Sequence, residues 1–432
     1  MTVAERVRLA ALLVSVGVAG NQGASYLLNV LGARLLVPAD FGELGSLLAV
    51  LVVGAVPALG LQTVAALRAA RSKAGETTGP ADTASPAGTA GTGGPTSAGG
   101  SAGAGRSPAS ELFSLGLTVS GVVAAVLLLG SPLIMGLLHL DSVWPVVWLA
   151  ASLASITVIC LWYGILQGTR RFGTLAGLLA CEGLGRIGGT AVGLVVFRDA
   201  EGALACTAIG ALVVAVIGWV VVGRPSPARH DRGHVREVVH AVQAMLALVL
   251  LVNLDLLLAR HQLPPAEAGE YAVGAIVTKI AYWLPQAVAI LVLPRFASAE
   301  GRRRFVPLAL AVCAVLDSVV VVGTAVLGPT VVGVIGGAEY ADSALPLWAF
   351  ATVGSLLALT QILLYSRIAS ADRRSLALIW GAVLVEAALI TFWLNGSLGQ
   401  VVGAAVVATG LLVAAGALVE VRARRVEPVD AH

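Results

Sequence analysis

The chain has 432 residues, of which 58% are hydrophobic and only 12% are charged. A soluble domain carries about 25% charged residues, so this chain has too little charge to cover a water-facing surface. The composition excludes an ordinary soluble protein, and it predicts that lipid covers much of the surface. The net charge of +3 says little until its distribution along the chain is considered.

Twelve apolar runs are long enough to cross a bilayer, which takes about 20 residues. In chain order they are Leu9–Ala33, Phe41–Leu67, Leu112–Leu138, Val143–Leu166, Phe172–Val196, Leu204–Val222, Val238–Ala259, Tyr271–Leu293, Phe305–Leu327, Leu345–Ile368, Leu376–Leu394 and Val401–Val421. The first run is longer than the apolar core of a signal peptide and has no convincing cleavage site, so we expect it to be retained.

Positive charge alternates from one side of these runs to the other. With the N-terminus in the cytoplasm, the cytoplasmic segments hold 22 of the 27 Lys and Arg residues, as the positive-inside rule requires. The outer loops hold only Arg34, Arg198 and Arg260 and are otherwise acidic. One helix more or fewer would disrupt this alternation. The sequence therefore predicts twelve helices in the cytoplasmic membrane with both termini in the cytoplasm.

An internal repeat divides the chain into two halves. The segment from Arg34 to Leu44 resembles the segment from Arg260 to Tyr271, and Arg170-Arg171 before Glu182 resembles Arg373-Arg374 before Glu386. These pairs link helix 1 to helix 7 and helix 5 to helix 11. A step of six helices is even, so both halves enter the membrane in the same direction and should be related by an axis along the membrane normal.

The predicted organisation follows from this repeat. We expect an all-α integral membrane protein with two pseudo-symmetric six-helix bundles, residues 1–223 and 237–421. The basic segment 224–236 would join them in the cytoplasm, and residues 422–432 would form a cytoplasmic tail. The Gly-, Ser- and Pro-rich tract Ser72–Pro108 cannot bury enough apolar surface to order itself, which predicts a disordered cytoplasmic loop.

Three groups of residues carry a family resemblance. They are Ala33–Gly42 after a helix with Asn21 and Tyr26; Leu166–Gly173; and Asn253 and Asp255 followed by Arg260, Gly269, Tyr271 and Pro294–Phe296. In this order and spacing, the sequence resembles polysaccharide flippases of the multidrug/oligosaccharidyl-lipid/polysaccharide (MOP) exporter superfamily.

The resemblance implies a function as well as a fold. It implies a central cavity between two bundles and alternating access driven by an ion gradient or the membrane potential. The implied substrate is a polyprenyl-diphosphate-linked oligosaccharide, with membrane lipids around the protein and glycosyltransferases or a polymerase of the same pathway as candidate partners. An ion-coupled multidrug or metabolite antiporter of the same superfamily is the alternative.

Charged residues inside apolar spans need a partner or a watery cavity, because each costs about 2.5–3.5 kcal/mol at the bilayer centre. Glu182 and Arg186, four residues apart, share one helix face and form either a structural ion pair or part of a substrate cavity. Lys279, Trp283 and Gln286 share another face, where a cation and an aromatic ring would suit a diphosphate-linked sugar. The alternative for Lys279 is a structural pair with Asp255.

Several uncharged polar residues complete the predicted cavity. Gln22, Tyr26 and Asn29 recur at helical spacing in the first span and line either the cavity or a helix–helix contact. Asn253 precedes Asp255 by two residues. The resemblance places Asp255 at the cavity, where a buried carboxylate could carry a proton, and Glu182 is the second ion-coupling candidate. The alternative for Asp255 is a salt bridge to Lys279 or Arg260.

Catalysis is not expected. The outer loops are short, and no nucleophile–base pair or cluster of metal ligands is present. Cys160, Cys181, Cys206 and Cys313 all lie in apolar segments without paired spacing, so they are interpreted as core residues. The sequence thus predicts a transporter without cofactor or metal and without a nucleic-acid partner.

Overall fold

The computed structural model describes residues 23, 25–77, 108–227, 233–283, 285, 299–340, 343–368 and 373–426. Within this part of the chain the secondary structure is helical, without strands. Eight of its helical stretches are long and apolar enough to cross a membrane, and two shorter apolar helices cover residues 347–363 and 376–392. The protein is therefore a multi-pass membrane protein, and each of the twelve predicted spans coincides at least in part with a described helix.

The N-terminal bundle begins with a helix over residues 25–35. It continues with α2 (Pro38–Gly54), α3 (Val56–Thr77), α4 (Pro108–Leu129), α5 (Ser131–Leu138), α6 (Trp144–Gly168), α7 (Phe172–Val196) and α8 (Ala200–Val222). The second predicted span is thus two helices, and so is the third. Pro57 and Pro132 stand at the start of the second helix in each pair, where a residue without an amide hydrogen interrupts the helical hydrogen bonds.

The predicted cytoplasmic loop Ser72–Pro108 is wrong at both ends. Helix α3 extends to Thr77, and α4 begins at Pro108, where proline fits the first turn of a helix. The polar segment up to Thr77 continues a helix that is already formed, which costs less than starting a new one. Residues 78–107 lie outside the described residues.

The C-terminal bundle contains α9 (Gly233–Gln262), α10 (Pro265–Trp283), α12 (Ala299–Gly336), α13 (Leu347–Ile368), α14 (Arg373–Phe392) and α15 (Leu398–Val426), with the short 3-10 helix η2 (Ala338–Tyr340) before α13. Helix α9 begins within the predicted linker 224–236. Helix α10 ends its described part at Trp283, so the rest of the eighth predicted span lies outside the description.

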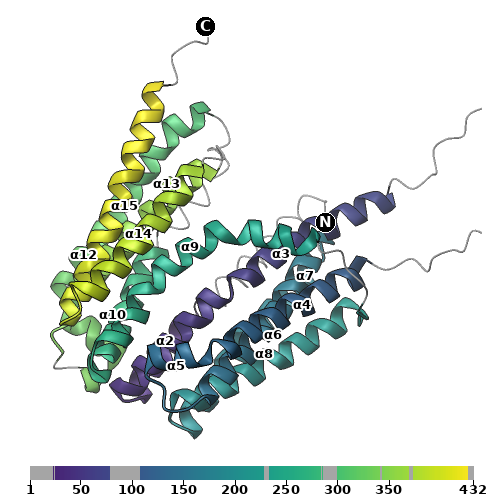
Figure 1. Ribbon diagram of the computed structural model, residues 1–432, viewed down its shortest axis with the longest axis horizontal. Coiled ribbons are helices and arrows are strands. Elements are labelled where there is room, and N and C mark those ends of the chain that lie inside the picture. The colour runs from purple at the N-terminus through teal and green to yellow at the C-terminus, as the bar shows by residue number, and fades with distance from the viewer. Residues whose placement is uncertain are drawn as a thin grey trace, which may run out of the picture.

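The two bundles meet at one end and diverge toward the other. Figure 1 shows α2 and α10 at the junction, while the end of α15 and the end of α3 point away from each other. Helix α9 lies between the bundles, because it packs on α14 and α15 as well as on α2 and α3. The predicted all-α architecture in two helical bundles is confirmed.

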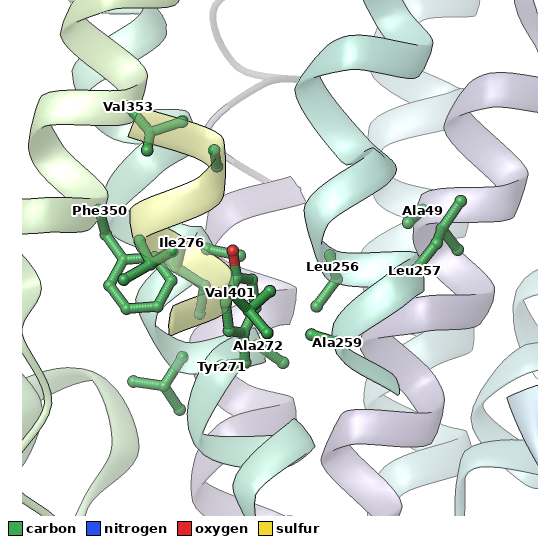
Figure 2. Packing of buried hydrophobic residues seen from close by; sticks show 14 of the residues in the cluster. Ala49, Leu256, Leu257, Ala259, Tyr271, Ala272, Ile276, Phe350, Val353 and Val401 are labelled. Carbon is green, nitrogen blue, oxygen red and sulfur yellow. The ribbon is translucent and has the colours of Figure 1, made fainter. Parts of the chain in front are cut away.

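One apolar core runs through the junction. Tyr271 and Ile276 of α10, Phe350 of α13 and Val401 of α15 are all at most 3% exposed, and Figure 2 shows them gathered around the ring of Phe350. On the other side of α9, Leu257 lies beside Ala49 of α2 (Figure 2). In a membrane protein, the close packing of such side chains is what holds helices together at the junction.

Candidate functional site

Equivalent positions of the two repeats contact each other where the bundles meet. Helix α2 begins at Pro38 and α10 begins at Pro265, and each carries a glycine four residues later. A Cβ atom on Gly269 would lie 1.9 Å from the carbonyl oxygen of Pro38, and one on Gly42 would lie 2.8 Å from the amide nitrogen of Gly269. Only glycine permits the two helices to come this close.

One turn further along α2, Gly45 extends the same seam. A Cβ atom there would lie 3.1 Å from the methyl group of Ala272. We call the pairing of Pro38, Gly42 and Gly45 with Gly269 and Ala272 the α2–α10 contact. Small residues let helix backbones approach closely in membrane proteins, where packing rather than hydrophobic exclusion holds helices together.

Matching arginines cross between the bundles beside this contact. The Nε atom of Arg34 donates to the carbonyl oxygen of Val334 in α12 at 3.1 Å. The Nε atom of Arg260 donates to the carbonyl oxygen of Leu138 in α5 at 3.0 Å, and its guanidinium lies 3.7 Å from the carboxylate of Glu43. Each repeat thus extends its arginine into the other half.

The partners of Arg260 also bear on the two interpretations of Asp255. Arg260 is paired with Glu43 of α2, so the salt bridge between Asp255 and Arg260 that the sequence left open is not formed. The reason is geometric: Arg260 is near the end of α9 and turns toward the other bundle, whereas Asp255 faces α10.

A buried acidic pair lies inside the C-terminal bundle. The hydroxyl of Tyr271 donates to Oδ2 of Asp255 at 2.9 Å, and the amide of Leu256 donates to Oδ1 at 2.8 Å. Glu386 of α14 is 1% exposed, interacts electrostatically with Asp255, and has one carboxylate oxygen without a hydrogen-bond partner. Two buried carboxyl groups that interact electrostatically favour sharing a cation or a proton over both being ionised. Glu386 is not among the predicted cavity residues, because nothing local in the sequence shows that α14 packs on α9.

Lys279 and Tyr26, from opposite halves, are brought together. The Tyr26 hydroxyl donates to the backbone carbonyl oxygen of Lys279 at 3.3 Å. The Lys279 side chain is half-buried. Its ammonium group is attracted by Asp255, but within the described part of the chain it forms no direct ion pair. Lys279 is therefore a half-buried cation on α10, the helix that forms the α2–α10 contact.

Glu182 and Arg186 form the ion pair that one of their two interpretations anticipated. The carboxylate and guanidinium lie 4.0 Å apart on α7, and the hydroxyl of Tyr163 in α6 donates to Glu182 at 2.8 Å. Helix α7 packs on α6 and α8, within the N-terminal bundle. The pair is thus attached to the bundle interior, on a helix that is not part of the α2–α10 contact.

The remaining predicted cavity residues have different surroundings. Trp283 is 40% exposed, at the end of the described part of α10. Asn253 is only 2% exposed, and its amide nitrogen donates to its own helix at the carbonyl of Val249. Asn29 likewise bonds to its own helix, at the carbonyl of Ser25. Gln22 and Gln286 lie outside the described residues.

The described residues contain no group of three or more His, Cys, Asp and Glu side chains that could hold a metal ion. The four cysteines are free thiols; Cys160 and Cys313 are buried, and Cys181 and Cys206 are partly buried.

Solved structures decide the fold of this chain. An inward-facing multidrug resistance MATE family transporter of the MOP superfamily superposes with a TM-score of 0.69 at 13% identity, over 94% of this chain and 96% of the other. MurJ, a lipid II flippase in an inward closed conformation, gives 0.72 at 13% identity over 95% and 87%. The chain has the MOP transporter fold. An outward-facing MATE transporter of the MOP superfamily gives a lower TM-score of 0.58 over 95% and 94%. The MOP fold accounts for the two bundles. The sequence itself matches no protein-family profile and no curated protein.

Proposed function

We propose that this chain is a transporter that moves a polyprenyl-diphosphate-linked oligosaccharide across the cytoplasmic membrane by alternating access. One observation carries the proposal. Helix α10 joins the two bundles through Gly269 and also places Lys279 beside Tyr26 of the other bundle. Lys279, the cation that would bind the substrate, therefore lies on the same helix as the α2–α10 contact, which closes one end of the protein.

The chemistry of Lys279 fits an anionic head group. A compact ammonium on a flexible stem offsets phosphate charge, and a half-buried ammonium in an apolar helix is costly unless an anion compensates it. Asp255 supplies part of that compensation, and a diphosphate would supply more. Trp283, one turn further along α10 and 40% exposed, offers a face on which a sugar can stack. The prenyl chain would remain in the lipid.

The direction of transport follows from the predicted topology. With both termini in the cytoplasm, the α2–α10 contact closes the outer end and the divergent end faces the cytoplasm. Residues 1–223 and 237–421 would rock against each other around α9, and the substrate would leave after the α2–α10 contact opens. No covalent bond is made or broken, so the activity requires no catalytic residue. Glycosyltransferases and a polymerase would supply and consume the substrate.

Lys279→Gln tests the proposal in proteoliposomes that contain a fluorescent polyprenyl-diphosphate oligosaccharide. A reagent that quenches only outer-leaflet label reports the flipping rate. The expected result is a loss of at least about tenfold, the effect of about 1.4 kcal/mol of lost charge pairing. Lys73→Gln changes the only other lysine of the chain, far along α3, and should flip at the wild-type rate. Equal rates for all three proteins would refute the role of Lys279.

An ion-coupled multidrug or metabolite antiporter is the second candidate. The buried pair Asp255 and Glu386 favours it, because carboxylates inside a membrane protein attract cations. Uptake of a fluorescent organic cation into the same vesicles under an imposed ion gradient separates the two functions. Uptake that Asp255→Asn abolishes, together with no lipid flipping, would establish the antiporter instead.

A further inference from the structure

We propose that Asp317 of α12 is a proton-binding site of the membrane interior, separate from the pair formed by Asp255 and Glu386. The described apolar part of α12 runs from Phe305 to Gly336. Asp317 lies twelve residues beyond Phe305, or about 18 Å along the helix axis. In an apolar layer about 30 Å thick this is near mid-depth.

The side chain of Asp317 faces protein rather than lipid. Val315, Val319 and Val322 on the outer face of α12 are at least 60% exposed, whereas Asp317 is 3% exposed. It follows Cys313 by one turn on the buried face, and this face packs against Ile362 of α13. Asp317 is therefore enclosed between two helices at a depth that water does not normally reach.

Neither carboxylate oxygen of Asp317 has a hydrogen-bond partner. Hydroxyl groups of α12 and α13 donate to their own helices: Ser318 to Ala314, Thr324 to Val320, and Ser355 of α13 to Ala351. An ionised carboxylate without donors would cost several kcal/mol here. A neutral carboxylic acid removes most of that cost.

No described charge replaces the proton. Helix α12 packs on α13, α10 and η2, whose ionisable groups include Lys279, Glu339 and Tyr340. Cys313, one turn away, is the only described ionisable side chain with an appreciable electrostatic interaction with Asp317.

The same surroundings favour a proton over a metal cation. A sodium or divalent ion needs several oxygen ligands at once, and the hydroxyl groups of Ser318 in α12 and Ser355 in α13 donate to backbone carbonyls of their own helices. A proton needs only one carboxylate oxygen. Release of the proton requires that α12 and α13 separate enough to admit water, so the protonation of Asp317 is tied to the packing of these two helices.

A hydrophobic carbodiimide tests this site on the full chain in native membranes. The reagent takes the acid proton onto one nitrogen while the carboxylate oxygen bonds to its central carbon. The adduct rearranges to an N-acylurea that retains the mass of the intact reagent, and peptide mass spectrometry locates it. We expect the adduct on Asp317, with a yield that falls as the pH is raised, no adduct on exposed Glu339, and none in Asp317→Asn. Ser318→Ala, a neighbouring variant, should be labelled like the wild type.

An infrared measurement makes the test independent of access by the reagent. Asp317→Asn keeps the size of the neutral acid, so it should fold, and it should remove one protonated-carboxyl C=O band from the wild-type spectrum at neutral pH. An unchanged band, or labelling of Asp317 that does not respond to pH, would overturn the proposal. Both readouts are independent of transport, so they stand or fall separately from the proposed function.

Discussion

The α2–α10 contact can be opened by a single methyl group. In Gly269→Ala the new Cβ would lie 1.9 Å from the Pro38 carbonyl oxygen, so the helices must separate by about 1 Å before normal contact is restored. Overpacking of this kind costs about 1–3 kcal/mol. Since the cost falls only on the state in which α2 and α10 touch, the equilibrium should shift about 5- to 150-fold toward the state open at this end.

Spin labels on either side of the junction measure that shift. Exposed Val143, beside α5, and exposed Glu339, beyond α12, lie near the ends where the arginine contacts cross between the bundles. Double electron–electron resonance should show a population with a longer distance between the labels. This population should be largest in Gly269→Ala, smaller in Gly42→Ala and smallest in Gly45→Ala. This order follows the distances of 1.9, 2.8 and 3.1 Å between the added Cβ and the nearest atom of the facing helix.

The control for this series is Gly136→Ala in α5, where a Cβ would meet nothing within 4 Å. It should give the wild-type distance distribution. A Gly269→Ala protein with the wild-type distribution, or a series in the reverse order, would mean that the α2–α10 contact does not hold the two bundles together.

Three further outcomes follow from other contacts. Arg260→Ala should raise the accessibility of a cysteine placed at Leu140, which is 7% exposed, to a water-soluble maleimide, since it removes the bonds to Leu138 and Glu43; unchanged labelling would show that these bonds are dispensable. Tyr271→Phe should lower the free energy of unfolding by about 1–3 kcal/mol, because Asp255 loses a donor, and thermal unfolding in detergent would reveal it. Gly164→Ala should lower the melting temperature through its contact with the Gln62 carbonyl within the N-terminal bundle, whereas Gly177→Ala should not; equal melting temperatures would count against tight α3–α6 packing.

The helices could be predicted because their signals are local. Each predicted apolar run coincides at least in part with a described helix, and α7 has the predicted bounds, Phe172–Val196. The interruptions at Ala55 and Gly130 were missed, although Pro57 and Pro132 mark them. Apolar length says nothing about a break within a run, since a proline near a helix start does not lower the hydropathy.

The site was harder to predict, because its contacts join residues far apart in the chain. The repeat correctly paired Arg34 with Arg260, but it could not show that each would reach carbonyl oxygens of the opposite bundle, since backbone acceptors leave no mark in a sequence. Tyr271 as the donor to Asp255 was equally hidden. Tyr271 lies sixteen residues after Asp255 in the sequence, and only the packing of α10 on α9 brings its hydroxyl to the carboxylate.

The two arginine crossings bear on what kind of motion the protein allows. Arg34 and Arg260 form hydrogen bonds between the bundles at two separate places, one contributed by each repeat. A single contact would allow one bundle to rotate about the membrane normal relative to the other. Two separate contacts resist this rotation. The motion that they hinder least is a tilt of one bundle relative to the other about the line that joins the two contacts.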